Sequence, residues 1–70
     1  MSKDDQLKAF GEQVKRLRKQ QGLTQEALAE RSGLSARYVS RVELGNVNLG
    51  LVAILQLASG LGRPAAELFK

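Results

Sequence analysis

Neither cysteine nor histidine occurs anywhere in the 70 residues of the chain. Without cysteine the chain can form neither a disulfide bond nor a thiolate metal site. Without histidine it lacks the commonest general base and the commonest metal ligand. Its serines therefore have no histidine base, and its carboxylates fall on predicted helix surfaces and caps. We expect no enzyme activity, no metal and no other cofactor.

Long apolar runs are missing as well. No stretch approaches the ~20 apolar residues that a membrane-spanning helix requires. The first five residues include two acidic side chains and no apolar segment, so they do not form a signal peptide. We therefore expect a cytoplasmic protein with no membrane partner. Residues 1–5 either form a capped helix start, through Ser2 and Asp5, or are disordered.

Positive charge is in excess. Eleven Lys and Arg residues against seven Asp and Glu residues give a formal net charge of +4. This charge suits an anionic partner such as nucleic acid, although many soluble proteins carry as much. Lys15, Arg16 and Lys19 cluster near the end of the first predicted helix, where they either face phosphate or cover a solvated helix end. The length allows one small domain, residues 1–70.

A three-residue turn signal occurs twice, as GLT at 22–24 and GLS at 33–35. In each, the glycine can take the left-handed conformation that ends a helix, and the leucine can pack under that end. The hydroxyl residue then caps the next helix by accepting a hydrogen bond from a first-turn amide. The pattern predicts a helix-turn-helix core over about 24–44, whose second helix can enter a DNA major groove.

Helical periodicity extends over most of the remaining chain. Leu7, Phe10, Val14 and Leu17 form one apolar stripe, and Gly11 within it implies close packing by a neighbouring helix. Further helices are expected at about 25–32, 36–44 and 51–61, with a short last turn opened by Pro64. The fold class is therefore all-α.

The chain resembles the phage repressor/Cro-like family of helix-turn-helix regulators, also called the XRE family. The resemblance covers nearly everything from about Leu7 to Phe69. The most specific matches are Arg18, GLTQ at 22–25, Leu28-Ala29, GLS at 33–35, YVSRVE at 38–43, Gly45 and LASGLG at 57–62. The family implies a compact five-helix bundle of the lambda repressor type. It also implies binding to near-palindromic operators as a homodimer.

The resemblance assigns base reading to one face of the recognition helix, about 36–44. These residues are Ala36, Arg37, Ser40 and Arg41. Arginine can donate two hydrogen bonds to guanine O6 and N7, and Ala36 can meet a thymine methyl group. The alternative for both arginines is phosphate contact. The residues expected to bind phosphate are Thr24, Gln25, Ser35, Tyr38, Asn46 and Asn48.

Some of these residues have a structural role in the same interpretation. Gln25 is also expected to brace the recognition helix, and Tyr38 either packs under the second helix or contacts phosphate. Arg18 and Glu43 match a family ion pair that fixes the recognition helix rather than touching DNA. The alternative for that pair is two independent surface charges.

Two departures from the family concern the loop after Gly45 and the last helix. The family often carries a basic residue and a proline in that loop, whereas this chain has Val47 and Leu49 there. We therefore expect a weaker electrostatic attraction between the loop and DNA phosphates. Pro64 stands where a hydroxyl cap is common, which leaves the start of the last helix poorly capped.

The predicted helix at 51–61 is apolar nearly all round, which exceeds one core stripe. We expect a dimer interface formed by Val47, Leu49, Val52, Leu68 and Phe69. The last two residues either fill the core or meet the second subunit.

Two functions follow. The leading one is a sequence-specific, DNA-binding transcriptional regulator, such as a Cro-like repressor or a restriction-modification controller protein. No small-molecule ligand is expected, because nothing remains beyond the DNA-binding domain. The alternative is an antitoxin that binds a toxin protein through the apolar excess and autoregulates its operon.

Overall fold

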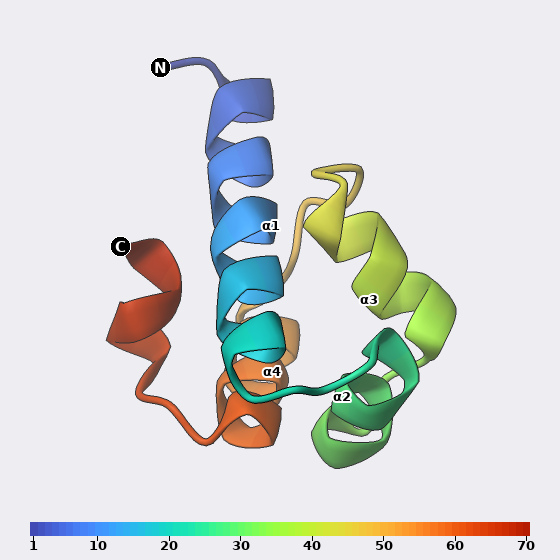
Figure 1. Ribbon diagram of the computed structural model, residues 1–70. Coiled ribbons are helices and arrows are strands. Elements are labelled where there is room, and N and C mark those ends of the chain that lie inside the picture. The colour runs from blue at the N-terminus through green and yellow to red at the C-terminus, as the bar shows by residue number, and fades with distance from the viewer.

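Five helical elements make up the computed structural model, which describes residues 1–70 (Figure 1). They are α1 (Lys3–Gln20), α2 (Gln25–Ser32), α3 (Ala36–Glu43), α4 (Leu51–Leu61) and η1 (Ala65–Phe69). The all-α expectation is confirmed, with no strand. The count of five α-helices is wrong, because η1 is a 3-10 helix. This element follows Pro64, has no side-chain cap and is too short for an α-helix to propagate.

Helix α1 begins at Lys3 rather than after a disordered start. The Ser2 hydroxyl accepts a hydrogen bond from the Asp5 amide at 3.2 Å. Ser2 is thus the N-cap, and two acidic residues in the first turn favour the same end of the helix. Of the two alternatives for residues 1–5, the structure has the capped helix.

The turn between α2 and α3 has the predicted geometry. Gly33 has a φ of 70°, and the Leu34 amide donates to the Ala29 carbonyl at 2.9 Å. The Ser35 hydroxyl then accepts from the Tyr38 amide at 3.0 Å. The turn between α1 and α2 repeats all three features. These local hydrogen bonds hold both turns in a defined conformation, so the helix-turn-helix prediction is confirmed.

All five elements contribute to one hydrophobic core. Its members are Phe10, Val14, Leu17, Leu28, Ala29, Val39, Val42, Leu57, Ala58, Leu61 and Leu68. Figure 1 shows α3 and η1 on opposite sides of α1. Leu68 of η1 is fully buried in the single chain. Its assignment to a dimer interface is therefore wrong, because the tertiary fold closes over it as a core residue.

Two glycines set how closely the helices approach. A Cβ on Gly11 of α1 would overlap the carbonyl oxygens of Val42 and Glu43 at the end of α3. A Cβ on Gly60 of α4 would lie 3.1 Å from the backbone nitrogen of Ser32 in α2. The close packing expected at Gly11 is confirmed, and its partner is α3.

A buried ion pair joins α1 to α3. Arg18 Nε donates to Glu43 Oε2 at 2.6 Å, and Arg18 Nη2 donates to Glu43 Oε1 at 3.0 Å. The side chains are only 10% and 3% exposed. The remaining Arg18 nitrogen, Nη1, donates to the Leu23 carbonyl at 2.8 Å. One guanidinium thus fixes α1, the first turn and the end of α3 relative to one another.

Pairing with Glu43 changes the pKa of Arg18. The hydrogen bonds that Arg18 donates to Glu43 raise the pKa of Arg18, and this effect outweighs the opposing effect of burial. Because a guanidinium keeps its proton in proteins, Arg18 is a permanent counter-ion for the Glu43 carboxylate. The expected structural pair is present, and the alternative of two independent surface charges is wrong.

Removing one partner should cost much more than removing both. We expect Glu43→Ala to lower the free energy of unfolding by about 3–5 kcal/mol, because Arg18 keeps a buried charge without a counter-ion. The double variant Arg18→Met, Glu43→Leu should recover most of that loss, because neither charge remains to be desolvated. Urea unfolding monitored by circular dichroism measures both. A loss below about 1 kcal/mol for Glu43→Ala, the range of surface pairs, would contradict this account.

Candidate nucleic-acid interface

Helix α3 separates an apolar side from a cationic one. Val39 and Val42 are buried, whereas Arg37 and Arg41 are exposed on the other side. Ala36 and Ser40 are half-buried at the edge of the exposed side. The four residues expected to read bases therefore share an outward face. Its edge lies toward the start of α2.

Helix α2 contributes its N-terminus to the same region. The Thr24 hydroxyl accepts from the Ala27 amide at 3.0 Å and caps the helix. Gln25, in the first turn, is half-buried, and its Nε2 donates to Glu43 Oε1 at 3.0 Å. The expected brace between Gln25 and the recognition helix is thus present. The free first-turn amides and the dipole of α2 favour an anion at this helix end.

Two further residues at the start of α3 were expected to bind phosphate. Ser35 is exposed and caps α3. Tyr38 is half-buried and packs against the hydrophobic core. Its ring therefore has the packing role that was one of its two alternatives.

The loop between α3 and α4 alternates polar and apolar residues. Asn46 and Asn48 are exposed, and their side chains form no hydrogen bond in the structure. Val47 and Leu49 are half-buried and pack against the core. The residues that replace the basic and proline positions of the family thus extend the hydrophobic core, which leaves this loop without a cation.

The two arginines on the outward face of α3, Arg37 and Arg41, form no ion pair. Ion pairs occur only between Arg18 and Glu43 and between Arg63 and Glu67. No carboxylate therefore competes for Arg37 or Arg41. Both guanidinium groups are available to an anionic partner.

A second exposed surface is apolar and belongs to α4 and η1. Val52 and Phe69 are 70% and 64% exposed, and both were expected at an interface. Leu51 and Leu55, also exposed, were not assigned there. The signal that could have identified Leu51 and Leu55 was the predicted helix at 51–61, which is apolar on nearly every side. We call the exposed side chains of Leu51, Val52, Leu55 and Phe69 the α4–η1 apolar surface.

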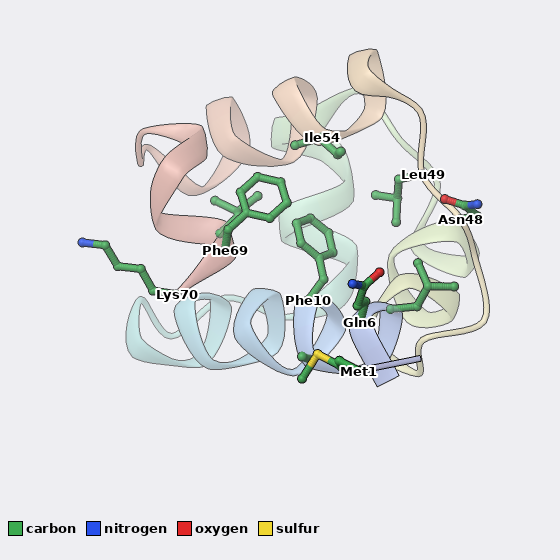
Figure 2. Close-up of a pocket in the computed structure, with 11 residues that line it drawn as sticks. Met1, Gln6, Phe10, Asn48, Leu49, Ile54, Phe69 and Lys70 are labelled. Carbon is green, nitrogen blue, oxygen red and sulfur yellow. The ribbon is translucent and has the colours of Figure 1, made fainter. Parts of the chain in front are cut away.

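Phe69 of this set also lines an open hollow of about 550 Å³ (Figure 2). It lies between the start of α1, the segment 48–49, α4 and η1. Figure 2 shows the rings of Phe10 and Phe69 side by side on its wall, and their centroids are 5.2 Å apart. Most of its lining is apolar. This hollow has the character of a packing surface rather than of a site for chemistry.

No group of three or more His, Cys, Asp or Glu side chains is placed to hold a metal ion. None of the helices combines the length and apolar character of a membrane span.

Comparison with known proteins places this architecture in a family. Residues 9–68 match the helix-turn-helix domain family. The chain is 41% identical over 64 residues to the uncharacterized HTH-type transcriptional regulator y4dJ of Sinorhizobium fredii, covering 91% of this chain and 83% of that protein.

Two solved structures of restriction-modification controller proteins are similar to the fold. C.AhdI from Aeromonas hydrophila has a TM-score of 0.88 and 48% identity, over 90% of this chain and 96% of that chain. Wild-type C.Esp1396I has a TM-score of 0.83 and 30% identity, over 90% and 82% of the two chains.

The family is one of DNA-binding regulators and not an enzyme class. With its capped turns, buried ion pair and exposed arginine face, the chain belongs to the phage repressor/Cro-like (XRE) family of helix-turn-helix, DNA-binding transcriptional regulators.

Proposed function

We propose that the protein is a sequence-specific regulator that binds a palindromic operator as a homodimer, with α3 in the major groove. The observation that carries this proposal is the exposed arginine face of α3. Glu43, at the end of α3, is held by both Arg18 and Gln25. A face held at a fixed angle can present its side chains to base edges in one register.

Arg37 is the central base-reading residue in this proposal. It is exposed, free of any ion pair and located in the first turn of α3, the part of a recognition helix that reaches base edges. Arg41 lies one turn further along the same face and reads a base or binds a phosphate. Ser40 and Ala36, at the edge of the face, contact neighbouring bases.

Phosphate contacts fix the register of the complex. Thr24 and Gln25 lie at the N-terminus of α2, where free amides and the helix dipole both favour an anion. Ser35 lies at the start of α3, and Asn46 and Asn48 follow its end. The Tyr38 hydroxyl is a further candidate, although its ring is packed in the fold.

Dimerisation through the α4–η1 apolar surface would complete the regulator. Exposed large apolar side chains on one surface of a small domain are typical of an interface. In a twofold dimer on DNA, the two α3 helices would lie about 34 Å apart and read half-sites one helical turn apart. Val52 and Phe69 remain in the proposed interface, and Leu51 and Leu55 join them. Val47 and Leu49 can contribute only their exposed parts.

The likeness to C.AhdI and C.Esp1396I supports a controller-like role for this chain. The antitoxin alternative rests on the same apolar surface, which would then be covered by a toxin instead of a second copy. The two proposals differ in what the purified protein does alone. A controller-like dimer selects its operator without any partner.

Site selection from random duplex DNA tests the proposal. We expect an inverted repeat, with affinity that falls as salt rises because phosphate contacts release counter-ions. Binding is measured by fluorescence anisotropy at two salt concentrations. Weak binding without sequence preference would contradict the operator proposal and favour the protein-partner alternative.

The dimer surface is tested separately by Val52→Lys. This change places a charge in the α4–η1 apolar surface without disturbing the core, so we expect the dimer to dissociate. Sedimentation velocity measures the mass. Gln20→Lys adds the same charge at an exposed position of α1 and should leave the dimer intact. A dimer that survives Val52→Lys would place the interface elsewhere.

Replacing Arg37 and replacing Gln25 should affect DNA binding in different ways. Arg37→Ala should cost about 1–3 kcal/mol of binding free energy and relax the preference at one base position of the operator. Gln25→Ala should weaken binding to all operators and leave their ranking unchanged, because a phosphate contact carries no sequence information. Anisotropy titrations on an operator and its single-base variants measure both. Uniform weakening by Arg37→Ala would make Arg37 a phosphate ligand.

A further inference from the structure

The side of α1 that contacts α3 determines which lysines of α1 lie near the recognition helix. Gly11 and Arg18 both contact the end of α3. At 100° per residue, core residue Val14 lies about 40–60° to one side of these two, and Lys15 lies about 40–60° to the other. Lys15 is therefore at the solvent side of the α1–α3 junction, and it is exposed.

The same reasoning applies to α3. Glu43 faces α1, and core residue Val39 lies about 40° to one side of it. Ser40 and Arg37 lie to the other side, by about 60° and 120°. Both helices bury one side in the same core. Lys15 and the arginine face of α3 therefore both lie on the side of the α1–α3 junction that is turned away from that core.

Lys8 lies two turns before Lys15 on the same side of α1, against Gly45, the second residue after the end of α3. A Cβ on Gly45 would lie 2.9 Å from Lys8 Cα and 2.7 Å from Lys8 Cγ, so the lysine stem covers Gly45. Lys8 is exposed and in no ion pair. Lys8 thus has no counter-ion, and its stem lies beside the start of the loop that includes Asn46.

Lys8 lies beside a segment in which cations are missing. The loop from Asn46 to Asn48 has no basic residue, and its apolar side chains pack on the core. Lys15 lies one turn from Arg18, whose three guanidinium nitrogens all donate hydrogen bonds within the fold. Lys8 and Lys15 are about 10 Å apart along α1, a separation that allows each to meet a different phosphate.

We propose that Lys8 and Lys15 form a phosphate-binding row on α1 that extends the DNA contact surface beyond the helix-turn-helix. This inference rests on the proposed DNA-binding function. The row supplies the backbone cations that the loop after α3 lacks. Arg16 is excluded from it, because Arg16 lies about 140–160° round the helix from Gly11 and Arg18.

The test compares salt dependence of binding for variants that lose one charge each. The probes are a random-sequence duplex, which reports phosphate contacts alone, and the selected operator. Because a homodimer carries each lysine twice, Lys8→Gln and Lys15→Gln should each reduce the slope of log Kobs against log[salt] by about 1.8, and the double variant by about 3.6. The ranking of operator variants should stay unchanged. Arg16→Gln removes one charge from the next residue and should leave the slope unaltered.

The outcomes separate this row from the proposed function. Equal slopes for Lys15→Gln and Arg16→Gln, or no change for Lys8→Gln, would overturn the row while leaving the regulator proposal intact. A wild-type protein that binds neither probe would overturn both. Matching urea unfolding curves for all variants confirm that the comparison is made between folded proteins, as expected for exposed positions.

Discussion

The hydrogen-bonded ion pair between Arg18 and Glu43 is the constraint on which the DNA-facing geometry depends. Taking two charges out of water costs free energy, and this cost is offset only when the geometry is good and the other polar atoms are satisfied. Both conditions hold, because Arg18 also bonds the Leu23 carbonyl and Glu43 also accepts from Gln25. The pair therefore contributes orientation more than stability. It joins α1, the first turn, α2 and the end of α3, which together set the direction of the arginine face.

Packing and recognition use opposite sides of the same short helices. Helix α3 has only eight residues, so its stability comes from Val39 and Val42 in the core rather than from the helix itself. The absence of a side chain at Gly11 lets the carbonyl end of α3 rest on α1. That close approach also places Lys8 of α1 against Gly45, which is the basis of the proposed extension of the DNA-contacting surface onto α1. A small domain can thus extend its cationic surface without a longer recognition helix.

The loop after α3 shows how stability and binding compete in a chain of this size. Val47 and Leu49 in this loop pack against the core, and the loop carries no basic residue. With 70 residues, additional buried apolar area matters, because a small domain buries a small fraction of its surface. The electrostatic contribution lost from the loop has a counterpart in the cations of α1. The apolar surface of α4 and η1 is a separate consequence of the same composition.

The sequence by itself determined the features that depend on near neighbours. The left-handed glycines and hydroxyl caps of both turns, and four of the five helical segments, involve residues three to five positions apart, so their patterns are readable without the fold. The pairing of Arg18 with Glu43 was accessible only through resemblance, because 25 positions separate the two residues. Only the tertiary structure decided that Leu68 enters the core while Phe69 stays exposed. The physical reason is that burial is set by contacts between elements distant in the chain, and adjacent residues of similar chemistry differ only in the side of the helix they occupy.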